Sequence, residues 1–148
     1  MNKLKFSRWF LWEDMEKIHY LNFPGVYMIA ITYKSLKGKK PHYKDDIRYI
    51  GMTNSRGGLK SRLKQFNASI HGKKLRHCGA DRICIKLGKY KKWNKKLFVC
   101  VHPIRCETNK EKRTPKDLRK MGQCTKLEYD AIAQIKQETG KEPIFNIK

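Results

Sequence analysis

The chain has 148 residues and a formal net charge of +22, because 35 residues are Lys or Arg and 13 are Asp or Glu. That length predicts a single domain with a real core, residues 1–148, and leaves no room for a large separate recognition domain. The self-repulsion of so many positive charges favours a polyanionic partner, with nucleic acid as the leading candidate. The basic residues are spread along the whole chain rather than gathered on one apolar-backed helix, so a membrane surface is not the expected partner.

The first 22 residues carry apolar side chains close to helical spacing. These side chains are Phe6, Trp9, Phe10, Met15, Ile18 and Leu21. The pattern predicts an N-terminal helix that packs on the core. The apolar run at residues 9–12 is followed by Glu13 and Asp14, so the sequence predicts neither a signal peptide nor a transmembrane span. We therefore expect a cytoplasmic protein without membrane contact.

Two apolar and aromatic segments come next. Residues 26–33 are dense in β-branched and aromatic side chains, and residues 47–50 form a shorter segment of the same kind, so both are predicted strands. Between them, residues 34–46 contain five lysines. This connection is predicted to be a solvated, basic hairpin loop, and its tip could equally contact phosphate.

Residues 58–66 form an amphipathic helical segment. Its apolar stripe continues to residue 70 and consists of Leu59, Leu63, Phe66 and Ile70. On a helical wheel, Arg62 lies at the edge of that stripe. Residues 52–80 contain seven Lys or Arg residues and no carboxylate, so Arg62 has no local partner and its natural partner is a phosphate group. The basic neighbours that are candidate nucleic-acid contacts are Arg56, Lys60 and Lys64.

The following segments are predicted to be strands joined by a basic loop. Residues 82–87 alternate between polar and apolar, and residues 97–101 are a continuous apolar run. The loop between them interleaves lysines with aromatic rings, a mixture that can contact phosphates and bases. Its candidate nucleic-acid contacts are Lys91, Lys92 and Trp93, although a solvated hairpin loop would have the same composition. Residues 103–123 are predicted to be a basic, adaptive loop with a short helix near residues 115–121.

The five cysteines favour reduced thiols over a disulfide framework, because their number is odd and none belongs to a Cys-x-x-Cys pair. A zinc site remains a minor alternative, since the spacing of the nearest His and Cys residues matches no standard zinc pattern. Its members would be His77, Cys78, Cys84 and His102.

Residues 126–138 are predicted to be helical. The apolar face is formed by Leu127, Ala131, Ile132 and Ile135. Glu128 falls inside that face, where a carboxylate is costly unless it is paired, hydrogen-bonded or bound to a metal ion. Thr125 and Glu128 also fit a capping box, and the pattern does not decide between the two interpretations. After the helix, residues 144–147 are predicted to form a short final strand or an extended tail.

Five short motifs along the chain resemble those of one enzyme family. In order they are Gly25-Val26-Tyr27, Tyr49-Ile50-Gly51, Leu59-x-x-Arg62-Leu63, Leu127-Glu128 and Pro143-x-x-Asn146. This series resembles the catalytic module of the GIY-YIG endonucleases over residues 24–146. The resemblance implies an α+β fold with a small mixed or antiparallel three-stranded sheet flanked by helices. It also implies DNA as the substrate, with residues 34–46 and 85–120 as candidate DNA-contacting insertions.

The chemistry implied by the resemblance assigns a role to each motif. Glu128 would hold one divalent cation, Mg²⁺ or Mn²⁺, on the scissile phosphate. Arg62 would neutralise the transition state. Tyr27 or Tyr49 would position the attacking water and deprotonate it, provided that Arg62, Arg48 or the metal lowers the tyrosine pKa. The role of Asn146 would be to brace Glu128 or the wall of the active site.

The chain departs from the family at Phe66, where many members have a His or Tyr one turn after the arginine. His77 is the candidate for that task, because His77-Cys78-Gly79 is similar to a His-Ser-Gly segment of some restriction-enzyme members. A plain loop histidine is the alternative. For the whole chain, the expectation is a restriction-like or stand-alone endonuclease that acts as a homodimer or nicks one strand. The alternative is a non-catalytic module that binds DNA or RNA.

Overall fold

A computed structural model describes residues 4–73 and 77–147 and has an α+β architecture, which confirms the predicted class. Its centre is an antiparallel sheet of four strands in the order β1-β4-β2-β3. The strands are β1 (Phe10–Leu11), β2 (Gly25–Thr32), β3 (Ile47–Thr53) and β4 (Lys96–Pro103). The expectation of three strands was wrong, because two residues, Phe10 and Leu11, pair with Val99 and Phe98 of β4. A strand of two residues is too short to leave an alternating pattern in the sequence.

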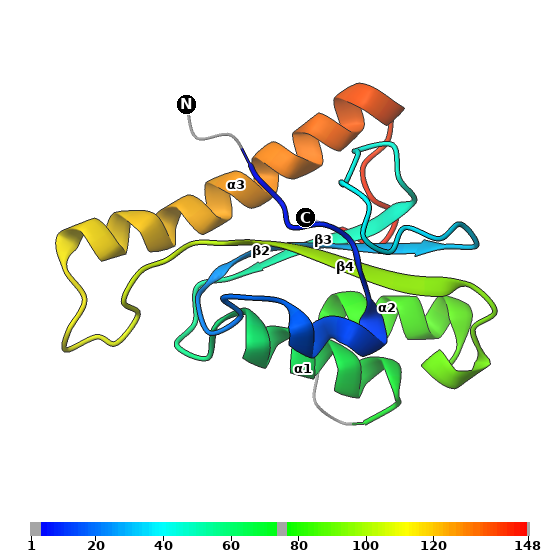
Figure 1. The fold of residues 1–148 in the computed structure, drawn as a ribbon, viewed down its shortest axis with the longest axis horizontal. Coiled ribbons are helices and arrows are strands. Elements are labelled where there is room, and N and C mark those ends of the chain that lie inside the picture. Colours follow the sequence, from blue (N-terminus) through cyan, green and yellow to red (C-terminus); the bar gives the residue numbers. More distant parts are fainter. Residues whose placement is uncertain (1–3, 74–76, 148) are drawn as a thin grey trace.

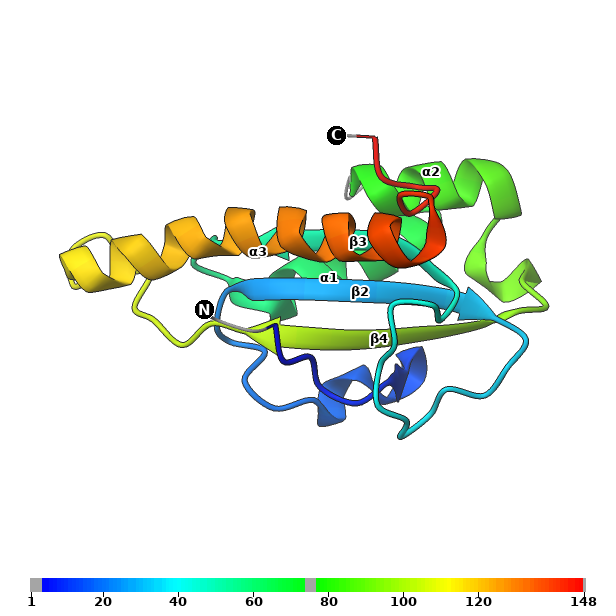
Figure 2. The same cartoon turned by 90° about the horizontal axis from the view of Figure 1, so that it is seen from above.

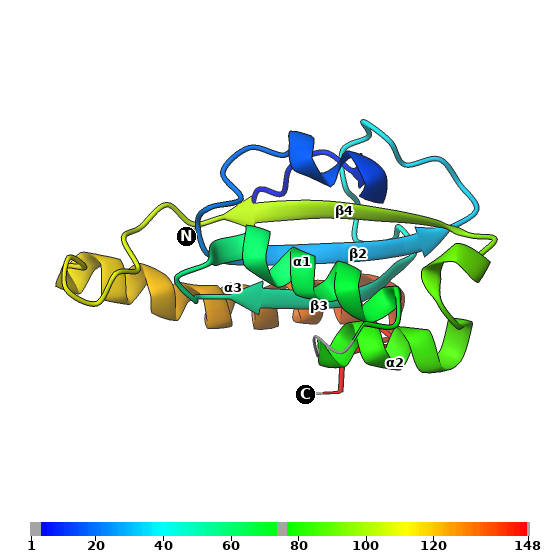
Figure 3. The ribbon, with the colours of Figure 1, turned by 90° about the horizontal axis from the view of Figure 1, so that it is seen from below.

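Helices cover both faces of this sheet. Figure 1 shows α3 (Pro115–Thr139) on one side and α1 (Gly58–Ile70) with α2 (Cys78–Leu87) on the other. Seen from below in Figure 3, α1 lies across the sheet and α2 lies near β3. All eight residues of β2 are buried as a result. Tyr27 and Ile29 pack on the side of α1, whereas Val26 and Met28 pack on the side of α3.

The N-terminal segment is not the predicted α-helix. Residues 12–17 form a short 3₁₀ helix, η1 (Trp12–Lys17), preceded by an extended stretch, and residues 1–3 lie outside the described part of the chain. Trp9 packs into the core on the α3 side of the sheet, whereas Trp12 packs into the core on the α1 side. The apolar spacing therefore arises because the segment supplies both cores from the edge of the sheet.

The segment predicted as a strand at residues 82–87 is the second half of helix α2. Its alternation is accidental, because Ile83 is fully buried whereas Ile85 is 86% exposed. The helix begins after His77, whose ring accepts a hydrogen bond from the Ala80 amide, and ends at Gly88 with a φ of 80°. The continuous apolar run at residues 97–101 is confirmed as part of β4.

Helix α3 starts much earlier than the apolar pattern indicated. Its N-terminus is a capping box in which Asp117 N donates to Thr114 Oγ1 and Thr114 N donates to Asp117 Oδ2. The short helix predicted near residues 115–121 is therefore confirmed as the first turns of α3. The capping box at Thr125, one of the two interpretations of Glu128, is wrong because Thr125 lies inside the helix. The buried residues of α3 begin at Cys124. Its first turns extend beyond the sheet in Figure 2 and carry no apolar stripe that a sequence pattern could detect.

The remaining segments complete the shell. Residues 144–147 form neither the predicted strand nor an extended tail, because Ile144 and Phe145 belong to a turn closed by Asn146 N, which donates to Pro143 O at 3.0 Å. Phe145 N donates to Arg48 O at 3.0 Å along the outer edge of β3. The five cysteines are free thiols, as predicted, and burial raises the pKa of Cys124 to about 12. None of the helices within the described residues combines the length and the apolar character that crossing a membrane requires.

Candidate active site

Tyr27, Tyr49, Arg62 and His77 meet on the α1 side of the sheet. The Tyr27 hydroxyl lies 2.5 Å from His77 Nε2, and it also hydrogen-bonds with Arg62 and with Tyr49. The Tyr49 and His77 rings contact each other edge to face, with centroids 5.5 Å apart. Four predicted site residues from β2, β3, α1 and the start of α2 thus form one cluster, the tyrosine-arginine cluster.

Arg62 lies partly buried in this cluster without a negative partner. Its Nη1 donates to Gln65 Oε1 at 3.0 Å, and its guanidinium also bonds with the Tyr27 hydroxyl. No carboxylate lies within ion-pair distance of Arg62 in residues 4–73 and 77–147. A partly buried guanidinium with only neutral partners retains most of its capacity to bind an anion.

His77 occupies the place that the sequence left open beside Phe66. The two rings meet edge to face with centroids 5.0 Å apart, so the imidazole that Phe66 lacks is supplied from the start of α2. His77 N donates to Ser69 Oγ at 2.9 Å, and its Nδ1 accepts from Ala80 N at 3.2 Å. We therefore assign the ring proton to Nε2, which donates to the Tyr27 hydroxyl.

The electrostatics of the cluster keep both acid-base groups neutral at ordinary pH. Burial, together with the positive charges of Arg62 and Arg82, lowers the pKa of His77 to about 3. Burial, followed by the charge of Tyr49, raises the pKa of Tyr27 well above its ordinary value. Arg62 lowers the pKa of Tyr27 but does not outweigh burial. The expectation that neighbouring cations depress the pKa does not hold for Tyr27, and Arg48 instead pairs with Asp46 at 3.5 Å.

Two glycines make room for the tyrosine rings. The sequence alone did not show why glycine occupies these positions. Gly51 lies opposite Tyr27 across the β2–β3 pair, and a Cβ at Gly51 would come within 2.3 Å of the Tyr27 hydroxyl. A Cβ at Gly79 would come within 2.4 Å of the Tyr49 ring. Ser69, which holds the His77 backbone, was also missed, because a serine inside a basic helix carries no distinctive signal.

Replacing Gly51 with alanine is expected to destabilise the fold by about 1–3 kcal/mol, because the added methyl group collides with a fully buried ring. Urea unfolding monitored by circular dichroism measures the change. The matched control is Gly122→Ala in α3, where a Cβ would meet nothing within 4 Å. There alanine should stabilise the helix by roughly 0.5–1 kcal/mol. Equal effects of the two substitutions would contradict the packing role of Gly51.

Asn146 holds the edge of the sheet beside the cluster. Its Oδ1 accepts from Ile50 N at 2.9 Å and its Nδ2 donates to Ile50 O at 2.8 Å. Ile50 stands between Tyr49 and Gly51, so Asn146 fixes the backbone from which the Tyr49 ring projects. Arg82 ties the same C-terminal segment to α2 by donating to Phe145 O at 2.8 Å. Of the two predicted roles, the contacts favour bracing the wall of the site.

Glu128 reaches the sheet from the other side. It is 1% exposed on the buried face of α3, as its place in the apolar pattern predicted. That face packs against the side of β2 and β3 opposite to α1. Strand β3 is the outermost strand on this side of the sheet, its outer edge is bonded to Phe145 and Asn146, and Glu128 and Arg62 lie on helices that cover opposite faces of the sheet. The described residues contain no group of three or more His, Cys, Asp or Glu side chains that could hold a metal ion.

The predicted nucleic-acid contacts fall into two groups. Arg56, Lys60 and Lys64 are exposed on or just before α1, and Lys60 and Lys64 line a hollow with residues of η1 and the following turn rather than the tyrosine-arginine cluster. Lys91 and Lys92 are exposed in η2 (Tyr90–Lys92), toward the opposite end of β2. A strand rises about 3.4 Å per residue, so the Thr32 end of β2 lies about 17 Å from Tyr27. The second group therefore lies too far away to contact the same phosphate as Arg62.

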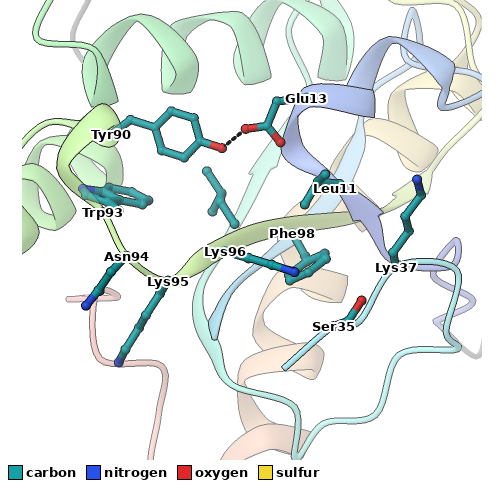
Figure 4. A pocket seen from close by; sticks show the side chains of 11 residues that line it. Leu11, Glu13, Ser35, Lys37, Tyr90, Trp93, Asn94, Lys95, Lys96 and Phe98 are labelled. Carbon is teal, nitrogen blue, oxygen red and sulfur yellow. Dashed lines mark hydrogen bonds between the residues drawn. The ribbon is translucent and has the colours of Figure 1, made fainter. Parts of the chain in front are cut away.

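Trp93 belongs mainly to the packing of the second group. Its indole N–H donates to Gly88 O at 2.8 Å, and its ring contacts Tyr90 edge to face at 5.1 Å. As Figure 4 shows, Trp93 and Tyr90 line a hollow of about 450 Å³, with the Tyr90 hydroxyl bonded to Glu13. Lys37, Lys95 and Lys96 also line it. The two predicted basic loops thus meet at one hollow, which gives residues 34–46 and 88–96 a common surface.

Comparison with models of protein families finds no match to this chain, and neither the curated proteins nor the solved structures yield a matching relative. Arguments about function therefore depend on the geometry of the tyrosine-arginine cluster and on the motif resemblance.

Proposed function

We propose that the chain is a metal-dependent DNA endonuclease that hydrolyses phosphodiester bonds by attack of water. The observation that carries the proposal is the guanidinium of Arg62, which is partly buried, has Tyr27 and Gln65 as neutral partners, and belongs to a chain of net charge +22. A phosphate is the ligand whose charge and geometry suit such a guanidinium. The order of the five motifs supports the same activity through the resemblance to GIY-YIG endonucleases.

In the proposed reaction, Arg62 donates hydrogen bonds to the non-bridging oxygens of the scissile phosphate. Negative charge grows on these oxygens as water attacks, so the bonds strengthen in the transition state. Because Arg62 is already held by Tyr27 and Gln65, little reorganisation is needed when the substrate binds.

The two tyrosines receive different tasks. Tyr27 is fully buried and its pKa is raised, so its hydroxyl serves as a fixed link between His77, Arg62 and Tyr49. Tyr49 is 7% exposed, more than Tyr27, and belongs to the outermost strand of the sheet. We therefore assign the attacking water to Tyr49, whose hydroxyl would position the water and whose phenolate form would accept the water proton and become the phenol. His77 positions the tyrosines rather than accepting a proton, because its Nε2 is the donor to Tyr27.

The donor set suits one hydrated Mg²⁺ or Mn²⁺. Magnesium commonly binds proteins through one or two carboxylates and takes its remaining ligands from water and substrate phosphate, and Glu128 offers a single buried carboxylate on the sheet side of α3. When bound there, the cation would stabilise the negative charge of the leaving oxygen. The residues of the tyrosine-arginine cluster bind and orient the phosphate from the opposite face of β3.

The basic surfaces favour a long nucleic-acid partner and a restriction-type enzyme. Lys37, Lys95 and Lys96 line the hollow toward the Thr32 end of β2, about 17 Å along the strand from Tyr27, so flanking duplex could contact them. Two cuts in a duplex need two such sites, which favours a homodimer or a nicking activity. The proposed location is the cytoplasm.

The proposal is tested with the cleavage of supercoiled plasmid in Mg²⁺ and in EDTA. Replacing Glu128 with glutamine should lower the cleavage rate at least about 100-fold, because a neutral amide binds a divalent cation poorly. Glu138→Gln on the same helix is the matched control, since Glu138 is exposed and only accepts from Gln134. Full cleavage by Glu128→Gln would remove the metal assignment.

A non-catalytic nucleic-acid-binding module is the second candidate. Two observations favour it: Glu128 lies across the sheet from Arg62, and the pKa of Tyr27 is raised. A binding role requires neither a carboxylate close to Arg62 nor a tyrosine with a lowered pKa. Tight binding of DNA by the intact protein without cleavage in Mg²⁺ or Mn²⁺ would support this candidate and contradict the endonuclease.

A further inference from the structure

The turn between η1 and β2 holds an exposed aromatic residue in an unfavourable backbone conformation. Tyr20 has a φ of 67° and is the only non-glycine residue with positive φ among residues 4–73 and 77–147. For a bulky L-residue this left-handed conformation is a genuine outlier. The side chain is nevertheless 47% exposed, so core packing does not explain why a tyrosine occupies the position.

The ring of Tyr20 carries an arginine on its face. The guanidinium carbon of Arg105 lies 3.8 Å from the ring centroid. Arg105 is itself exposed and forms no ion pair within the part of the chain that the structure describes. Stacking restrains a guanidinium while its N–H groups, which lie in its own plane, remain free to bind an anion. The pair, called here the Tyr20–Arg105 stack, is thus an ordered cationic group at the surface.

Backbone hydrogen bonds join this stack to the helix that carries Arg62. Leu21 O accepts from Lys60 N at 2.7 Å, and Phe23 O accepts from Leu59 N at 2.9 Å, so the turn caps the start of α1. On its other side, Pro24 O accepts from Ile104 N at 2.7 Å, which holds the segment of Arg105 in place. The turn therefore fixes both members of the stack relative to the first turn of α1.

The same contacts set the distance to the candidate active site. A Cβ at Gly58, the first residue of α1, would come within 2.5 Å of Asn22 O, so the helix approaches the turn closely. From Gly58 to Arg62 the helix rises about 6 Å. Along the helix axis this is close to two base-pair steps of about 3.4 Å each. A duplex whose scissile phosphate lies on Arg62 would bring a neighbouring phosphate within reach of Arg105.

We propose that the Tyr20–Arg105 stack is a second DNA-contacting site, which positions duplex DNA on the proposed active site. Arg105 binds a backbone phosphate near the scissile one, and the Tyr20 ring both orients the guanidinium and packs against the adjoining sugar or base. This inference rests on the proposed function for its substrate. It assigns the strained turn a role that neither core packing nor the chemistry at Arg62 requires.

The test measures binding and folding in parallel, with fluorescence anisotropy of a labelled duplex in EDTA and thermal unfolding. Tyr20→Gly and Tyr20→Asn should weaken DNA binding by roughly tenfold, because the stacking partner is lost. Both residues tolerate a left-handed backbone, so the unfolding midpoint should stay constant or rise by about 2–4 °C. Tyr20→Phe keeps the ring and should bind DNA as the native chain does.

Arg105 provides the complementary arm. Arg105→Lys preserves the charge but not the planar stack, and should also weaken binding by about five- to tenfold. Arg105→Gln should in addition reduce the slope of log K against log salt by about 1, because one phosphate contact is lost.

Different failures are distinguishable. Unchanged affinity for DNA in both Tyr20→Gly and Arg105→Lys would overturn the second site and leave the endonuclease proposal intact. A clear fall of the unfolding midpoint in Tyr20→Gly would have the same consequence, because it would show that Tyr20 has a structural role. Tighter binding to double-stranded RNA than to DNA of the same sequence would overturn the assignment to DNA. If the Tyr20 and Arg105 variants lose affinity for DNA as predicted but the native chain cleaves no DNA, the endonuclease proposal alone is overturned.

Discussion

Replacing Arg62 with lysine is expected to lower the single-turnover rate of plasmid cleavage by about 10³-fold, while the affinity for DNA changes by less than about threefold. Lysine retains the positive charge that attracts the duplex but loses the planar fork that can donate to two phosphate oxygens at once. It also loses the bonds that fix the side chain between Tyr27 and Gln65. An interaction that matters mainly in the transition state affects the rate far more than binding.

Lys64 provides the matched control for this experiment. It lies on the same helix and is exposed, so Lys64→Gln should weaken DNA binding and reduce its salt dependence without changing the rate of the bound complex. A cleavage rate for Arg62→Lys within tenfold of the native value would show that Arg62 is only an electrostatic contact. Circular dichroism of the Arg62→Lys and Lys64→Gln variants checks that α1 remains folded.

The strand-helix part of the fold could be predicted because its local signals agree. Strand β2 is a continuous run of β-branched, aromatic and aliphatic residues, as a central strand covered on both faces should be. Helix α1 has one apolar stripe, and Leu59, Leu63 and Phe66 of that stripe are fully buried. The positions of Tyr27, Tyr49 and Arg62 follow from these elements once the first two are placed on one face of the sheet.

The resemblance named His77 as a candidate, but its position beside Tyr27 and Phe66 could not be predicted because helix α2 was interpreted as a strand. The alternation of Ile83, Ile85 and Leu87 imitates a period of two, although only Ile83 is buried. With a strand in that place, His77 becomes a loop residue of unknown direction. In the structure, His77 caps α2 and its ring packs on Phe66.

The position of Glu128 illustrates a different limit. Its burial followed from the helical pattern, because on a helical wheel Glu128 lies between Leu127 and Ile132, which both face the core. The pattern does not tell which face of the sheet that helix covers, since both faces of β2 are apolar. The relation between Glu128 and Arg62 therefore depends on tertiary structure, and it places β3 between the proposed metal ligand and the proposed phosphate ligand.

Acidification is expected to destabilise the protein through His77. The imidazole is fully buried, and its pKa is lowered from 6.5 to about 3 because burial and the charges of Arg62 and Arg82 oppose protonation. Between these two values the unfolded chain binds a proton at this site and the folded chain does not. The contribution of His77 to stability is thus complete above about pH 6.5 and decreases as the pH falls toward 3. From pH 7 to pH 5 the loss should be about 2 kcal/mol.

Urea unfolding at pH 7, 6 and 5 measures this loss, and His77→Asn should remove about 2 kcal/mol of the pH dependence whatever its effect on stability at pH 7. This pH range lies above the usual pKa of Asp and Glu, so carboxylates contribute little to the difference. His71→Asn is the matched control, because it makes the same substitution at an exposed histidine at the end of α1. An unchanged pH dependence in His77→Asn would mean that the pKa of His77 is not lowered by folding, and it would contradict a neutral, buried imidazole that links Tyr27 to α2.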